Sequence, residues 1–137
     1  MCTQFTPLAK YDHSHAISQC EHGTIHLTWE HCTFRLAPEQ FTQIADLLGR
    51  TQQTGPHPLY HDILVVLVQA NKGVNVWIGA VGLALSFEGF ELLCALVLQA
   101  AHALQSVHIY RGHCLDMDDL AQQPTVPYYG SQTFSTN

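Results

Sequence analysis

The chain has 137 residues, of which 47% are apolar and 12% are charged, and its formal net charge is −6. These values predict one folded domain, residues 1–137, and argue against long disordered stretches. Only five residues are Lys or Arg, and they do not cluster, which excludes the basic patch of a typical nucleic-acid-binding protein.

The beginning of the chain, MCTQFTPLAK, has neither the basic segment nor the apolar stretch of a secretory signal peptide. The most apolar runs, Ile63–Val68 and Phe90–Leu104, are too short or too interrupted for a membrane span. We therefore expect a cytoplasmic protein without membrane insertion, in which the five cysteines are reduced. The low charge also predicts that part of the surface is covered, in a homo-oligomer or a larger complex.

Residues 13–49 predict three strands followed by a helix. Apolar residues alternate over residues 25–29, which indicates a strand with one buried face, and the alternation resumes over residues 32–36. Glu30-His31 between them fits a two-residue hairpin turn. A further strand precedes this hairpin and ends at the glycine turn Glu21-His22-Gly23.

The first predicted helix begins near Pro38, a residue tolerated at the first helical position, with Glu39 beside the positive end of the helix dipole. Gly49 is the expected stop just after its last turn. An apolar stripe marks the face that the helix would bury: Phe41, Ile44, Leu47 and Leu48.

The same pattern recurs over residues 62–106, when Leu36 is aligned with Leu85 and Phe41 with Phe90. The glycine turn is now Asn71-Lys72-Gly73, and the hairpin turn is Gly79-Ala80. The second helix would begin after the N-cap Ser86 and run to about Ser106, apolar on nearly all sides and therefore buried on several of them.

The expected fold is thus α+β. Two tandem βββα repeats, residues 13–49 and 62–106, would form one two-layer domain with an antiparallel sheet of about six strands and both helices on one face. Residues 50–61 would link the repeats, and residues 112–137 would form a polar C-terminal tail.

Histidine and cysteine are concentrated in the segment 13–32, HSHAISQCEHGTIHLTWEHC. The predicted strands divide these donors between two ends, separated by roughly 20 Å at about 3.3 Å per residue. The first choice for a metal site is the set at the end that holds the hairpin turn: His13, His15, His31 and Cys32. The second choice is the set at the glycine turn: Cys20, His22 and His26.

Imidazole and thiolate ligands favour zinc, or else copper or iron. The spacing matches no zinc motif, and the ordinary alternatives are a buried cysteine and solvated histidines. A third set lies at the second helix and beyond it: His102, His108, His113 and Cys114.

No catalytic motif occurs, so enzymatic activity is not indicated. The function predicted from the sequence is a small, cytosolic, non-enzymatic protein that binds a transition metal through its N-terminal His and Cys residues. The alternative is a metal-free interaction or scaffold subunit of a homo-oligomer or larger complex, since Trp77 and Ala84 make the far face of the second hairpin apolar. A Cys/His enzyme is the third possibility.

Overall fold

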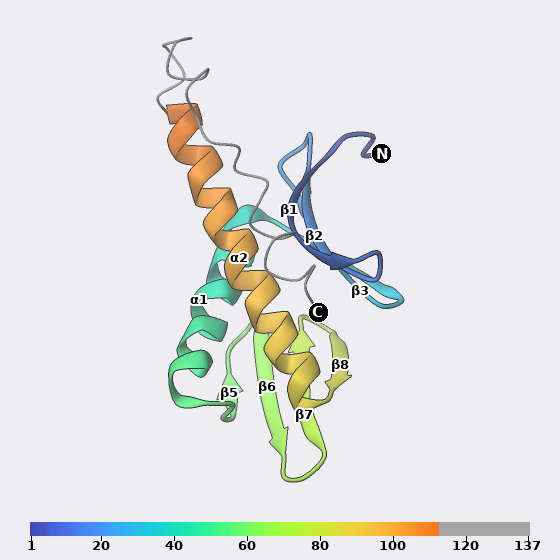
Figure 1. Cartoon of the computed structure of the whole chain (residues 1–137), viewed down its shortest axis with the longest axis vertical. Helices are drawn as coiled ribbons and strands as arrows, with labels where there is room; N and C mark the ends of the chain where they lie inside the picture. The colour runs from blue at the N-terminus through green and yellow to red at the C-terminus, as the bar shows by residue number, and fades with distance from the viewer. Residues whose placement is uncertain (113–137) are drawn as a thin grey trace.

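The computed structural model describes the backbone of residues 1–112 and the side chains of residues 1–106. This part of the chain folds into two successive units, each with four strands followed by a helix (Figure 1). The first unit consists of β1 (Phe5–Asp12), β2 (His15–Cys20), β3 (Ile25–Trp29), β4 (Cys32–Leu36) and α1 (Pro38–Thr54). The second consists of β5 (Leu59–Tyr60), β6 (Leu64–Gln69), β7 (Gly73–Ile78), β8 (Val81–Leu85) and α2 (Phe87–Gly112).

The fold is α+β, as predicted, but the single sheet of about six strands is wrong. Two separate antiparallel sheets form, in the orders β1-β2-β3-β4 and β5-β6-β7-β8. Both helices therefore cannot cover one face of one sheet. Instead, α2 packs against α1, against β1 and β2 of the first sheet, and against β7 and β8 of the second. A helix that is apolar on nearly all sides can bury several faces at once, which explains this central position (Figure 1).

Each unit has one strand more than the predicted βββα repeat. In the first unit this strand is β1, whose pairing with β2 shifts register between Pro7 and Ala9 and again between Lys10 and Asp12. The irregularities break the alternation of apolar residues, and Pro7 lacks a backbone donor, so the sequence does not resemble a regular strand. The additional strand of the second unit is the two-residue β5, which lies within the predicted linker 50–61.

The two predicted hairpins are confirmed, including their register. Trp29 pairs with Cys32 in the first hairpin, and Ile78 pairs with Val81 in the second. The glycine turns are also confirmed, since Gly23 and Gly73 have φ angles of +89° and +136°, a region that favours glycine.

Helix α1 buries the predicted apolar stripe but extends past Gly49 to Thr54. Gly49 is therefore not a C-terminal stop. It lies where α2 approaches α1: a Cβ atom added there would be 3.4 Å from Leu98 Cδ2. The small residue serves helix packing rather than helix termination.

Helix α2 begins as predicted, with Ser86 Oγ accepting a hydrogen bond of 3.0 Å from the Gly89 N–H. Its stretch Phe87–Ser106 is long and apolar enough to cross a membrane, so the length argument from the sequence does not hold for this helix. Here the helix contributes to one continuous core that spans both units, through these buried residues: Phe90, Leu93, Cys94, Leu96, Val97, Ala100, Ala103 and Leu104. The predicted tail, with His113 and Cys114, and the side chain of His108 lie outside the described residues.

Candidate metal centre

The turn between β2 and β3 gathers the donors at its tip. The Gly23 N–H donates to the Cys20 carbonyl, and the Cys20 N–H donates to the Thr24 carbonyl, each at 3.0 Å. With Gly23 in the left-handed region, the chain reverses within a few residues. Cys20, the last residue of β2, is thereby held close to the turn residue His22.

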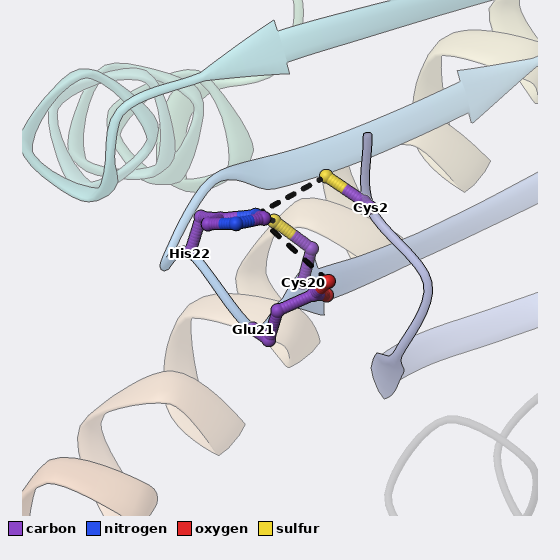
Figure 2. A group of neighbouring side chains, drawn as sticks. All are labelled: Cys2, Cys20, Glu21 and His22. Carbon is purple, nitrogen blue, oxygen red and sulfur yellow. Dashed lines mark hydrogen bonds and ion pairs between the residues drawn. The ribbon is translucent and has the colours of Figure 1, made fainter.

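A second segment reaches the same place from the N-terminal side of β1. The β1–β2 ladder begins where Phe5 pairs with Cys20. Ahead of it, the Glu21 carboxylate accepts hydrogen bonds from the Thr3 and Gln4 N–H groups at 2.9 and 3.1 Å. This attachment, which we call the Glu21 clamp, places Cys2 beside the turn (Figure 2).

Four residues from the two segments form a group whose ligand atoms all lie within 4.8 Å of one another: Cys2, Cys20, Glu21 and His22. Cys2 Sγ is 3.7 Å from His22 Nδ1, and Cys20 Sγ is 4.0 Å from the same nitrogen. His26, on the neighbouring strand β3, is outside this group, but its Nε2 atom is 3.7 Å from Cys2 Sγ. Sulfur and imidazole atoms thus converge near Cys2 (Figure 2).

These separations match those within a zinc site. With Zn–S bonds of about 2.3 Å and Zn–N bonds of about 2.0–2.1 Å, sulfur and nitrogen ligands of a tetrahedral ion lie about 3.6 Å apart. The three S···N separations, from 3.7 to 4.0 Å, exceed that value only slightly.

The role of Glu21 in the group is to hold the segments together. Its Oε1 atom accepts hydrogen bonds from the N–H and the hydroxyl of Thr3, and its Oε2 atom accepts one from the Gln4 N–H. The Thr3 N–H is the largest of several hydrogen-bonding causes that lower the pKa of Glu21 to about 2. Because both oxygens are engaged, Glu21 is less suited to bind a metal than the four S and N donors around it.

The two thiols of the site have opposite pKa shifts. Desolvation opposes ionisation of Cys20, but hydrogen bonds from Cys2, from His26 and from the backbone N–H groups of the turn outweigh it, and the pKa of Cys20 falls to about 6. The hydrogen bond to Cys20 is the main cause that raises the pKa of Cys2. The pair therefore favours ionisation of Cys20 over ionisation of Cys2, and the thiolate is the form of cysteine that binds metals.

The site is partly enclosed. Cys20 and His26 are buried, at 5% and 8% exposure, whereas His22 is exposed. The ring of His26 packs edge-on against Phe5, with centroids 5.1 Å apart. On its other side the site borders a cleft of about 510 Å³, lined by these residues: Gln4, Thr6, Gln19, Cys20, Glu21, His22 and Gly23.

Of the second-choice donors from the sequence, Cys20 and His22 belong to the close group, and His26 lies beside it, next to Cys2. The first-choice set lies apart from them. His15 Nδ1 is 2.8 Å from Asp12 Oδ1, and the imidazole packs edge-on against Trp29, with centroids 4.5 Å apart. His15 pairs with Trp29 and Trp29 with Cys32, so the indole residue stands between these two donors. His13 and His31 occupy the two adjacent turns.

Among residues 1–106, the group of close donors described above does not include any member of the first-choice set. A metal held by His13, His15, His31 and Cys32 would require His15 to leave Asp12 and to reach past Trp29. That set stays a prediction from the sequence alone.

The sequence did not suggest Cys2 or Glu21 as part of the site. Cys2 could have been found only by recognising β1 as a strand, because its antiparallel pairing with β2 returns the start of the chain to Cys20. Glu21 resembles an ordinary charged turn residue until the strand beside it is known. Both omissions follow from the irregular sequence of β1.

No protein family, curated protein or solved structure matches this chain.

Proposed function

We propose that this protein binds one zinc ion through Cys2, Cys20, His22 and His26. The observation that carries the proposal is the set of three S···N separations between 3.7 and 4.0 Å, contributed by two segments of the chain. Two thiolates and two imidazoles form the Cys₂His₂ set common in tetrahedral zinc sites.

The donor types favour zinc over other ions. Calcium and magnesium bind oxygen ligands, and the carboxylate oxygens of Glu21 are already hydrogen-bonded. Copper(I) accepts the same soft donors and is the closest competitor, because thiolates and imidazoles also suit it. The set of two thiols and two imidazoles, common in tetrahedral zinc sites, supports zinc as the ion of this site.

A zinc ion here would join the segment ahead of β1 to the β2–β3 turn. Cys2 lies outside the β1–β2 ladder, and the Glu21 clamp attaches the backbone of the two residues that follow it to the turn. Four protein ligands fill a tetrahedral ion and leave no position for a substrate. The site therefore suits a binding or structural role rather than catalysis, which supports a non-enzymatic protein.

The test is the metal content and spectrum of untagged protein, compared among matched variants. Elemental analysis is expected to find one zinc per chain, and cobalt(II) in its place should give the charge-transfer absorption of a dithiolate tetrahedral site. Cys2→Ser, Cys20→Ser and His26→Ala should each weaken binding, whereas the controls Cys32→Ser and His31→Ala should not.

The reverse pattern would contradict the proposal and favour the other donor set. If Cys32→Ser and His31→Ala abolished binding while Cys2→Ser had no effect, the metal would be held at the first hairpin turn. Unaltered metal content in all five variants would exclude both sets.

A second candidate function, an interaction subunit, is favoured by the far face of the second sheet. Trp77 on β7 is 42% exposed and lies over Gly82 on β8, where a Cβ atom would be 2.9 Å from the indole ring. The hollow beside it is lined by uncharged residues: Asn75, Trp77, Gly82, Leu83 and Ala84. Exposed apolar faces of this kind commonly mark interfaces.

Sedimentation analysis of the wild type and of Trp77→Lys tests this candidate. A self-associating protein should dissociate when a charge is placed on this face, whereas Thr33→Lys, on an exposed position of the first sheet, should leave its mass unaltered. A wild-type monomer would remove the homo-oligomer from consideration.

A further inference from the structure

Cys2 and Cys20 are two free cysteines whose sulfur atoms lie in one group of side chains. Both sulfurs are within 4.8 Å of each other and of His22 Nδ1. A disulfide requires an S–S bond of about 2.05 Å, so the sulfurs must approach one another further. The structure permits this approach, because Cys2 lies outside the strand ladder, which begins at Phe5.

We propose that hydrogen peroxide oxidises Cys2 and Cys20 to a disulfide in the metal-free protein, and that this bond removes both sulfur ligands from the metal site. The disulfide is inferred from the positions of the two sulfur atoms. The loss of the metal ligands rests on the proposed zinc site.

The Glu21 clamp brings Cys2 to Cys20 without fixing its side chain. The hydrogen bonds run from Glu21 to the backbone of Thr3 and Gln4, not to the thiol. The clamp therefore leaves the Cys2 thiol beside Cys20, with contacts of 3.7 Å to the imidazoles of His22 and His26. This arrangement favours reaction between these two sulfurs over reaction between either of them and a more distant cysteine.

Access selects a small oxidant. Cys20 is only 5% exposed, but it lines the polar cleft of about 510 Å³ beside Gln4 and Gln19. A hydrogen peroxide molecule fits such a cleft and can reach the sulfur through it. A bulky peptide disulfide must present its own sulfur to a buried atom, which the walls of the cleft oppose.

The reaction balances in two steps. The Cys20 sulfur attacks one oxygen of hydrogen peroxide, the O–O bond breaks, and a sulfenic acid and water form. The Cys2 sulfur then attacks the sulfenic sulfur, the S–S bond forms, and the S–O bond breaks with release of a second water that takes up the Cys2 proton. The two cysteines lose two electrons, and peroxide gains them.

The remaining described cysteines are placed less favourably for this reaction. Cys94 is fully buried in α2. Cys32 is half-buried and pairs with Trp29 at the far end of β3 from the turn that holds Cys20. Neither belongs to the group of close donors. They provide matched controls for the pair.

The first experiment treats metal-free, full-length protein with hydrogen peroxide, blocks the remaining thiols and maps the unreduced tryptic peptides by mass spectrometry. Trypsin cuts after Lys10 and so separates Cys2 from Cys20. A cross-link between peptides 1–10 and 11–35 is expected, and a phosphine reductant should reverse it. The second of these peptides also contains Cys32, so the cross-link must persist in Cys32→Ser to be assigned to Cys20.

The variants decide the outcome. Cys94→Ser and Cys114→Ser should keep the cross-link, whereas Cys2→Ser should lose it and accumulate the sulfinic and sulfonic acids of Cys20. Irreversible oxidation of Cys20 in the wild type without a cross-link, or a cross-link that disappears in Cys32→Ser, would overturn the disulfide.

The second experiment treats zinc-loaded protein with peroxide and follows released zinc with a chromogenic chelator. One zinc is expected to leave for each disulfide formed, and the reductant should restore binding. A disulfide that forms while zinc stays bound would overturn the coupling. If the wild type binds no zinc, the proposed function and the coupling both fail, while a cross-link in the first experiment still establishes the disulfide.

Discussion

The carboxylate of Glu21 accepts the backbone N–H of Thr3 at 2.9 Å, and this contact joins the start of the chain to a turn that follows two strands later. Glu21→Gln keeps the size of the side chain but replaces one acceptor oxygen with a donor group. We expect zinc affinity to fall by about 10–100-fold, the usual effect of losing a group that orients metal ligands. Competition with a chelator of known affinity measures the loss.

The control for this prediction is Glu39→Gln, an exposed carboxylate in the first turn of α1. Its affinity for zinc should equal that of the wild type. If Glu21→Gln also binds as the wild type does, Cys2 does not depend on the Glu21 clamp.

The same carboxylate predicts a dependence of stability on pH. Its pKa is lowered from 4.5 to about 2, mainly by the Thr3 N–H, so the folded state favours the ionised form. The stabilisation is complete above the ordinary value of 4.5 and is lost as the pH falls towards 2. In metal-free protein, the difference in melting temperature between the wild type and Glu21→Gln should therefore be constant above pH 4.5 and shrink below it. A difference that disappears at higher pH would point to another group.

The hairpins and helices were predictable because their residues follow one period each. In β3 and β4 the apolar positions alternate, and the pairing of Leu27 with Phe34 puts both on the buried face. The α1 stripe from Phe41 to Leu48 has the helical period. In these elements the local pattern and the tertiary packing demand the same residues.

The division into two sheets was not predictable, because it depends on contacts between distant segments. Every strand pairs only with strands of its own unit. The pattern of apolar residues in β4 and β5 does not indicate whether these two strands pair with each other. The decisive feature is the surface of α2, which buries residues against both sheets. Cys2 was not predicted as a ligand for the same reason. Its closeness to Cys20 depends on the pairing of β1 with β2, and the irregular sequence of β1 does not indicate a strand.

The two glycine turns should differ in their tolerance of alanine. A Cβ atom at Gly73 would clash with the Leu85 carbonyl oxygen, whereas nothing lies within 4 Å of one at Gly23. The Leu85 backbone cannot move away, because Leu85 pairs with Val74 in the ladder. Gly73→Ala should cost at least about 2 kcal/mol of unfolding free energy. Gly23→Ala should cost about 1 kcal/mol, from its backbone conformation alone. Urea denaturation measures both, and equal losses would show that the close approach at Gly73 is relieved.

The first residues of the two hairpin turns, Glu30 and Gly79, can be exchanged to test the effect of backbone conformation on stability. Glu30 and Gly79 begin corresponding turns with φ angles of +54° and +61°, and only the first has a side chain in this left-handed conformation. Such a side chain costs about 1–2 kcal/mol, which glycine avoids at an entropic cost of about 0.5–1 kcal/mol. Glu30→Gly should therefore raise the free energy of unfolding by up to about 1 kcal/mol, and Gly79→Glu should lower it by about as much.

Glu30→Ala separates the backbone from the side chain in this exchange. Alanine keeps the left-handed penalty, and the hydrogen bond of 2.6 Å from the Glu30 N–H to the Ser14 carbonyl does not involve the side chain. In thermal and urea unfolding, Glu30→Gly should therefore have a higher free energy of unfolding than the wild type, whereas Glu30→Ala should not. If both variants are stabilised equally, the carboxylate itself opposes folding, and the conformation of the turn is not the cause.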